Sequence, residues 1–171
     1  MQWGDNAKAR FFYRDREHQC AQLQAAIDHA GPLGGKMVVD IGCGYGDLLG
    51  LLPPCAYVGV DPDRYAVAQA QLLWPDHEFH ATEAVPKGDV LIAVASLQCI
   101  PDKKKALRSW MRKARERVVV VTCRWEHLPE SDQDELEWEG IVRDVYVSDD
   151  DFVTSVVSTA YTASVLTKEA S

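Results

Sequence analysis

Hydrophobic and polar positions alternate between a helical and a strand pattern along most of the chain. The first helical stretch places four apolar residues at intervals of three or four: Cys20, Leu23, Ile27 and Ala30. This spacing puts the four side chains on one face of a helix, which Gly31 and Pro32 then end. The sequence therefore predicts an amphipathic helix that ends near residue 30.

Short apolar runs follow, separated by further helical segments. The predicted strands are residues 36–41, 57–60, 78–81, 89–95 and 117–123. The predicted helices are residues 47–52, residues 62–74 and a segment in which Leu107, Trp110, Met111 and Ala114 share one side. Strands that alternate with helices form βαβ units, so we expect an α/β fold with a doubly wound, mostly parallel sheet and helices on both faces.

The last part of the chain has a less distinct pattern. Residues 126–139 are acidic and polar, and residues 141–147 have the composition of a strand. Ser148 and the three aspartates after it resemble a helix N-cap, which predicts a short helix over residues 152–157 before a final strand over 161–166. The Val, Thr and Ser content of this region equally allows one long strand from Phe152. We expect the helix.

Composition and charge narrow the class of partner. The 171 residues are 47% hydrophobic and 26% charged, which is ordinary for one globular domain. The net charge is −8, whereas nucleic-acid binders normally carry a positive balance because neutralisation of phosphates supplies most of their affinity. The negative charge therefore argues against a nucleic-acid partner. No apolar run approaches the ~18 residues of a membrane span, so we expect no membrane partner either.

The cysteines and the start of the chain indicate a reducing compartment. The five cysteines are Cys20, Cys43, Cys55, Cys99 and Cys123. They form no CxxC pair and are odd in number, which argues against a zinc cluster and against a disulfide framework. The first 19 residues are charged and aromatic, unlike a signal peptide. We therefore expect a cytoplasmic protein without a bound metal.

A glycine-rich loop is the most informative stretch of the sequence. Gly42, Gly44 and Gly46 follow a predicted buried strand, at the edge where doubly wound sheets bind ligands. Residues without a Cβ atom let a ligand lie against the main chain. Asp61 ends the next strand, where a carboxylate can accept hydrogen bonds from both hydroxyls of a ribose. This pattern predicts a nucleoside site.

Asp47 limits which nucleotide the loop can bind. The dinucleotide fingerprint GxGxxG, read from Gly42, requires a glycine at this position. A carboxylate at the start of the following helix would also repel a pyrophosphate at the helix N-terminus, and the chain contains no GxxxxGK[ST] phosphate loop. The loop therefore favours a nucleoside with little negative charge beside the glycines, and a nicotinamide oxidoreductase is disfavoured.

The segment DIGCGYG at residues 40–46, followed by VGVD at residues 58–61, resembles the first two motifs of class I S-adenosylmethionine-dependent methyltransferases. The resemblance covers roughly residues 20–125. It implies S-adenosylmethionine as the cofactor and a Rossmann-like sheet of seven strands whose last strand is antiparallel. It also implies a single domain over residues 1–171, with an N-terminal lid and helix (1–30), a cofactor-binding core (36–125), and an acidic loop with the final strands (126–171).

The resemblance also implies roles for individual residues. Asp40 and the backbone of Gly42, Cys43 and Gly44 would hold the methionine moiety, in a loop that Gly46 completes. Asp61 would bind the ribose, with Pro62 beside the adenine. Thr82 and Glu83 would approach the adenine amino group, with Glu83 in place of the acid that would align with Ala81. Ala95 and Ser96 would approach the sulfonium end of the cofactor.

Two more candidate residues lie near the ends of the core. Tyr13 belongs to an aromatic segment that would fold over the cofactor as a lid, with simple packing against the sheet as the alternative. His127 follows the fifth strand and is the candidate general base, with an ordinary surface histidine as the alternative. A dedicated base is optional because orientation of the nucleophile supplies much of the rate of methyl transfer.

Charge and size suggest the substrate. Residues 126–151 hold 11 of the 26 acids and begin at the catalytic edge, which favours a cationic amine, although a solvated loop is the alternative. Residues 103–117 hold eight of the 18 basic residues, which we interpret as a solvated outer helix. Because the core fills nearly the whole chain, we expect either a small-molecule substrate, methylated at N or O, or a homodimer in which another subunit completes recognition. The alternatives are an inactive cofactor-binding subunit that stabilises a partner and a methyltransferase for tRNA or protein.

Overall fold

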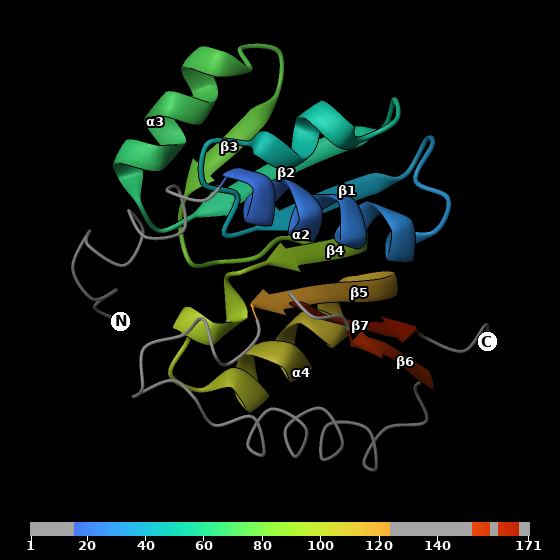
Figure 1. Cartoon of the computed structure of the whole chain (residues 1–171). Coiled ribbons are helices and arrows are strands. Elements are labelled where there is room, and N and C mark those ends of the chain that lie inside the picture. The colour runs from blue at the N-terminus through green and yellow to red at the C-terminus, as the bar shows by residue number, and fades with distance from the viewer. Residues whose placement is uncertain (1–15, 124–151, 158–160, 168–171) are drawn as a thin grey trace.

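The computed structural model describes residues 16–123, 152–157 and 161–167 (Figure 1). The helices in these ranges are α2 (Arg16–Ala30), α3 (Arg64–Leu73) and α4 (Lys103–Lys113), with two short 3₁₀ helices, η1 (Asp47–Leu51) and η2 (Leu97–Cys99). The strands are β1 (Met37–Ile41), β2 (Ala56–Asp61), β3 (Glu78–Ala81), β4 (Gly88–Val94), β5 (Ala114–Cys123), β6 (Phe152–Val157) and β7 (Tyr161–Thr167).

The strands of these ranges form one seven-stranded sheet in the order β3-β2-β1-β4-β5-β7-β6. The pairs β1–β2, β2–β3, β1–β4 and β4–β5 are parallel. The last strand, β7, runs antiparallel to both of its neighbours, β5 and β6. The predicted α/β fold, with a mostly parallel sheet and an antiparallel last strand, is confirmed.

Helices cover both faces of the sheet (Figure 1). Val38 of β1 and Ile92 of β4 pack with α2 on one face, whereas Val39 and Leu91, their neighbours along the same strands, pack with Trp110 of α4 on the other. Alternate residues of a strand point to opposite faces, so strands covered on both sides need apolar residues at every position. This is why residues 37–39 of β1, 90–94 of β4 and 118–121 of β5 form continuous apolar runs.

Two details of the predicted elements are wrong. Residues 152–157 form the strand β6 and not a helix, since their backbone pairs with β7 along its length. The β-branched residues Val153, Thr154, Val156 and Val157 favour this strand, and the preceding N-cap pattern did not outweigh them. Cys20 is exposed although it was expected on the buried face of α2, while Ala26 of that helix is fully buried. The predicted strand at residues 141–147 lies outside the described residues.

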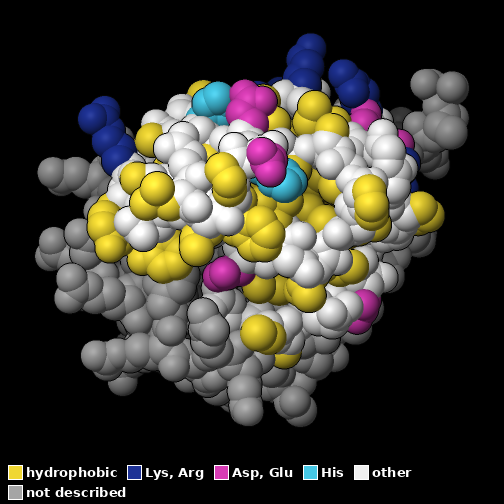
Figure 2. All heavy atoms as spheres, turned by 90° about the horizontal axis from the view of Figure 1, so that it is seen from above, with side chains coloured by type: hydrophobic (Ala, Val, Ile, Leu, Met, Phe, Trp, Pro, Cys, Tyr) yellow, Lys and Arg dark blue, Asp and Glu magenta, His cyan; other side chains and the backbone are white. Residues whose placement is uncertain are grey.

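The outer face of α3 is unusually apolar. Tyr65, Leu72 and Leu73 are 65%, 75% and 60% exposed, and Leu51 of η1 is 40% exposed. Figure 2 views the molecule from above, and hydrophobic side chains are spread over this face. None of the helices in the described part of the chain is long and apolar enough to cross a membrane.

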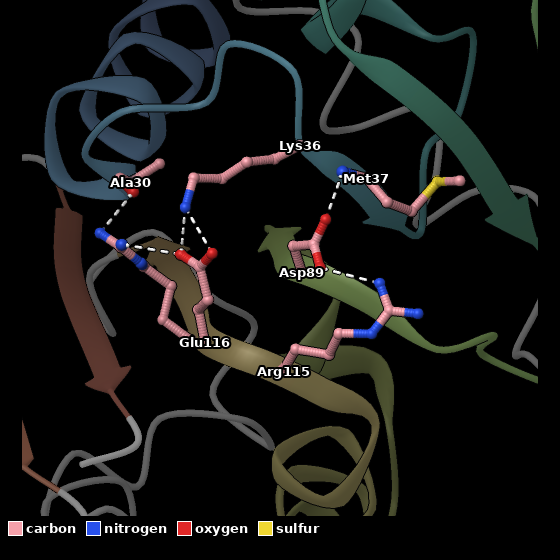
Figure 3. A network of polar contacts seen from close by, with 7 residues as sticks. Ala30, Lys36, Met37, Asp89, Arg115 and Glu116 are labelled. Carbon is pink, nitrogen blue, oxygen red and sulfur yellow. Dashed lines mark hydrogen bonds and ion pairs between the residues drawn. The ribbon is translucent and has the colours of Figure 1, made fainter. Parts of the chain in front are cut away.

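A polar network joins the end of α2 to the starts of β1 and β5 (Figure 3). The Glu116 carboxylate accepts hydrogen bonds from Lys36 and from Arg117 Nη2. Arg117 Nη1 donates to the carbonyl oxygen of Ala30 at 3.0 Å, which satisfies one of the free carbonyls at the end of the helix. The network therefore fixes α2 against the sheet.

A second carboxylate joins the starts of β1, β4 and β5 in the same way (Figure 3). Asp89 accepts from the backbone N–H of Met37 and from Arg115 Nη1, both at 2.8 Å. These contacts hold the amino ends of three parallel strands in register. The opposite edge of the sheet, where the same strands end, carries the glycine loop.

Candidate cofactor site

The predicted cofactor-binding residues meet at the carboxyl edge of the sheet. Gly42 follows β1, Asp61 ends β2, and Ser96 lies two residues after β4. Because β1 lies between β2 and β4 in the sheet, the ends of these three strands are adjacent. The chain leaves β1 toward β2 and later returns to the other side as β4, so this edge contains the topological switch point at which doubly wound sheets bind ligands.

The glycines of the loop are required by both conformation and packing. Gly42, Gly44 and Gly46 have φ angles of 72°, 53° and 79°, in the left-handed region that favours glycine. A Cβ atom at Gly42 would lie 2.5 Å from Ser96 Cβ, and one at Gly46 would lie 2.9 Å from Trp74 Cδ1. The loop therefore packs tightly against the end of β4 and against the segment after α3.

Backbone N–H groups of the loop are used within the protein. Gly42 and Cys43 donate to the carbonyl oxygen of Val60 at 2.8 and 3.2 Å, and Gly44 donates to Asp61 Oδ2 at 3.0 Å. A phosphate site needs such groups pointing at the ligand. The carbonyl oxygens of Cys43, Tyr45 and Gly46 each accept a hydrogen bond within the protein as well. Since a carbonyl oxygen has two lone pairs, the loop can still accept a hydrogen bond from a ligand ammonium group, which agrees with the prediction of a ligand with little negative charge.

Asp61 keeps acceptor capacity for a ribose. Its Oδ2 accepts from Gly44, and its Oδ1 accepts from the backbone N–H of Asp63 at 2.8 Å. A carboxylate has about four lone-pair positions, so each oxygen can accept one more hydrogen bond, as two vicinal hydroxyls require. Burial raises the pKa of Asp61, and the two backbone hydrogen bonds offset only part of this rise. The backbone thus fixes the orientation of this carboxylate before any ligand binds.

Asp40 is a buried carboxyl group among other acids. It is 4% exposed, and Tyr57 donates its phenolic hydrogen to Asp40 Oδ2 at 2.8 Å. The pKa of Asp40 is raised to about 7, mainly by burial and in part by the charges of Asp61 and Asp47, while the hydrogen bond from Tyr57 limits the rise. Asp47 is held by Gln19 of α2, whose Nε2 donates to it at 3.1 Å. These three acids make the environment of the loop suitable for a cation.

The end of β4 combines backbone strain with an unpaired hydroxyl. Ala95 has a φ of 51°, the only positive φ of a non-glycine residue in the described part of the chain. Its N–H donates to the carbonyl oxygen of Val121 at 2.8 Å. Ser96 is 5% exposed, and among the described residues its Oγ has no hydrogen-bond partner. Buried unpaired polar atoms and strained residues are concentrated at functional sites, so both features favour a ligand site here.

The loop after β3 lies beside the end of β2. Ala81 pairs with Asp61 in the sheet, and Thr82 N–H donates to the Asp61 carbonyl oxygen at 2.9 Å. Thr82 Oγ1 accepts from the N–H of Ala84, so part of its hydrogen-bonding capacity serves the turn. Glu83 is exposed and Pro62 is half-buried. These residues border the site, and their contacts with adenine stay predictions.

Two predicted site residues, Tyr13 and His127, lie outside the described residues, as do residues 126–139. The lid and the general base therefore stay predictions.

Tyr57, in contrast, is a site residue that the sequence reasoning did not identify. The available signal was a tyrosine in a buried strand next to the strand of Asp40, because a buried phenol needs a hydrogen-bond partner. The described residues contain no group of three or more His, Cys, Asp or Glu that could hold a metal ion.

The fold and the site together define a Rossmann-like protein that binds a nucleoside carrying positive charge. S-adenosylmethionine fits this description: its ribose suits Asp61, its ammonium group suits the loop carbonyls and carboxylates, and its sulfonium adds a second positive charge. A family model described as a methyltransferase domain matches residues 39–122. This match covers most of the predicted cofactor-binding core and confirms the predicted resemblance to S-adenosylmethionine-dependent methyltransferases, together with the enzyme class and the cofactor.

Solved structures of methyltransferases share this fold. Magnesium protoporphyrin IX methyltransferase from Synechocystis PCC 6803, with bound SAM, is 16% identical, with 90% of this chain and 80% of that chain covered and a TM-score of 0.69. The plantazolicin methyltransferase BamL, in complex with a triazolic desmethylPZN analog and SAH, is 9% identical, with 95% of this chain and 90% of that chain covered and a TM-score of 0.73. A SAM-dependent methyltransferase from Aquifex aeolicus is 14% identical, with 93% of this chain and 97% of that chain covered and a TM-score of 0.70. No sequence among the curated proteins matches the chain.

Proposed function

We propose that this methyltransferase transfers a methyl group to a nitrogen or oxygen atom of a small molecule. The observation that carries the proposal is that the described elements form the sheet and its covering helices and no additional domain. The methyltransferase match covers residues 39–122, and the described elements outside it, α2, β6 and β7, all belong to the sheet or cover it. Within the described residues, nothing forms a separate domain for a large substrate.

A cationic amine is the substrate class that the charge distribution favours. Glu126, Glu130, Asp132 and Asp134 follow β5 in the sequence, and β5 ends at the same edge of the sheet as the glycine loop. Acidic residues at the mouth of a site raise the local concentration of cationic substrates. The substrate ammonium group would first release its proton to solvent, and the neutral amine would then provide the lone pair for attack on the methyl carbon.

The described residues would act by binding and orientation. The cofactor supplies an electrophilic methyl group on its sulfonium. Asp40 and the loop carbonyls would hold the ammonium group, and Asp61 would hold the ribose. Ser96 Oγ, buried and without a partner in the described residues, would donate or accept one hydrogen bond at the methionine end. Holding the reacting atoms in line is the main source of rate that such a site can provide.

The first experiment is calorimetric titration with S-adenosylmethionine and S-adenosylhomocysteine, followed by methyl-transfer assays with a panel of amines and alcohols. Asp61→Ala should weaken binding ~10-fold or more, about 1.4 kcal/mol, because the ribose loses its acceptor. Asp89→Ala is the matched control, since Asp89 also accepts a backbone N–H at 2.8 Å but lies at the opposite edge. It should leave the dissociation constant within about twofold.

The outcomes separate the candidate functions. Methyl transfer to an amine that Asp61→Ala weakens would support the proposal. Cofactor binding without transfer to any amine or alcohol would overturn it and favour the inactive subunit or a macromolecular substrate. Failure of folded wild-type protein to bind either cofactor form would contradict the assigned roles of Asp40 and Asp61.

Location and assembly are part of the same proposal. We place the enzyme in the cytoplasm because Cys20, Cys43 and Cys55 are free thiols, as is usual in a reducing compartment. We also propose a homodimer, which would complete substrate recognition around a minimal core. The exposed apolar side chains of α3 are the available surface for such a contact (Figure 2).

A further inference from the structure

Tyr57 and Asp40 form a hydrogen-bonded pair under the glycine loop. The two residues lie on adjacent strands and on the same face of the sheet, because Tyr57 pairs with Val38 and Asp40 pairs with Gly59. The phenol donates to Asp40 Oδ2 at 2.8 Å. When Asp40 is ionised the phenol must be the donor, because a carboxylate oxygen only accepts.

The ring of Tyr57 is held in a fixed orientation. It packs edge-on against Phe79 of β3, with 5.6 Å between ring centroids, and against His77, with 6.0 Å. Tyr57 is 6% exposed. A buried ring held on two sides presents its hydroxyl group to Asp40 at little cost in conformational entropy.

The groups that face Asp40 make its charge sensitive to small changes. They are Tyr57 and Asp61 from β2, Asp47 from η1 and the Cys43 thiol from the loop, and His77 lies behind the tyrosine ring. Burial raises the pKa of Asp40 to about 7. At neutral pH the carboxyl group of the free protein is therefore divided between its protonated and ionised forms, and one hydrogen bond or one ligand charge changes the proportion.

We propose that Tyr57 is a positioning residue that holds Asp40 ready to bind the cofactor ammonium group, and that cofactor binding releases a proton from Asp40. The O–H bond of the protonated Asp40 breaks, the proton passes to solvent, and the carboxylate accepts a hydrogen bond from the ammonium group. This inference rests on the proposed role of Asp40 at the methionine end of the cofactor.

The linkage has a definite sign. A cation beside Asp40 lowers the Asp40 pKa in the complex relative to the free protein. Affinity for the cofactor should therefore fall as the pH is lowered below about 7, because binding must then displace a proton. Above pH ~8 the α-amino group of the ligand itself loses its charge, so the acid side of the profile is the side that reports on Asp40.

The test is the pH profile of S-adenosylmethionine binding between pH 5.5 and 8.5 for wild type and Tyr57→Phe. The variant loses the hydrogen bond that favours the ionised carboxylate, so the acid side should move to higher pH by about one unit, which is about 10-fold weaker binding at pH 6.5. At pH 8 the two proteins should differ by less than about threefold. Tyr65→Phe makes the same chemical change at an exposed position and should leave the profile unchanged.

A second measurement detects the proton itself. Titration at pH 7 in phosphate and in Tris buffer, which differ in their enthalpies of ionisation, should show proton release for wild type. Asp40→Asn can still accept the hydrogen bond from Tyr57 but cannot titrate, so its proton release should vanish and its acid-side pH dependence should flatten.

These results separate the inference from the function on which it rests. If wild type binds the cofactor with no proton release, or if Tyr57→Phe weakens binding equally at every pH, the inference is overturned while the cofactor site stands. If wild type binds the cofactor at no pH, the site assignment itself fails.

Discussion

Ala95, at the carboxyl end of β4, has a backbone conformation that L-residues rarely adopt. Its φ of 51° is held by the hydrogen bond of its N–H to Val121 and by the packing of the next residue, Ser96, against Gly42. A left-handed conformation costs an alanine about 1–2 kcal/mol relative to an ordinary one. This strained residue lies at the point where β4 meets the cofactor site.

Replacing Ala95 by glycine should stabilise the protein. Glycine removes the strain, and its greater entropy in the unfolded chain offsets about half of the gain, so the free energy of unfolding should rise by about 0.5–1 kcal/mol. Denaturant unfolding measures the change. Ala93→Gly, within the buried strand, is the control and should destabilise. A loss of stability for Ala95→Gly would show that strain is not stored there.

At the scale of the elements, the helices depend on specific anchors as well as on apolar faces. Arg117 of β5 caps the last turn of α2 and pairs with Glu116, and its guanidinium lies where a side chain at Gly31 would be. Such a contact links a helix to a strand that is 87 residues away in the sequence. The periodicity of either element alone does not reveal it.

Arg117→Ala should lower the free energy of unfolding by about 1–3 kcal/mol, because a helix-end carbonyl and a half-buried carboxylate lose a charged donor. Thermal and denaturant unfolding measure the effect. Arg115→Ala serves as the comparison, since its side chain is 65% exposed and pairs only with Asp89 among the contacts of Figure 3. An exposed ion pair contributes at most about 1 kcal/mol. Equal effects of the two variants would argue against the anchoring role of Arg117.

At the scale of the whole molecule, a buried acid couples global stability to pH. The pKa of Asp40 is about 7 in the folded protein, whereas its ordinary value is 3.8. A carboxyl group with a raised pKa binds more protons in the folded state, so its contribution to stability decreases as the pH rises from about 4 to about 7. Above pH 7 the buried, ionised Asp40 therefore lowers the free energy of unfolding of the protein.

Asp40→Asn should remove part of this cost. At pH 8 the free energy of unfolding should rise by about 2 kcal/mol, below the limit of about 4 kcal/mol that the pKa difference sets. At pH 4 the gain should disappear, because the wild-type group is then protonated in the folded state. Unfolding curves at the two pH values provide the measurement. A gain of equal size at both would mean that charge burial is not its cause.

Most of the architecture and the chemical class of the site follow from the local pattern of amino acids. Strands covered on both faces need continuous apolar runs, and positive φ angles beside a tightly packed strand end need glycine, so β1, β4, β5 and the loop at Gly42 were predictable from local pattern. The motif around this loop also indicated the cofactor.

Other features depend on which segments meet in space, so local pattern could not predict them. Residues 152–157 could have been helix or strand by composition, and pairing with β7 made them β6. The partner of Asp40 is Tyr57, 17 residues later, because β1 and β2 pair in one particular register. Local sequence encodes which side chains are buried, whereas the hydrogen-bond partner of a buried polar group, and hence its protonation, depends on the neighbour that the fold supplies.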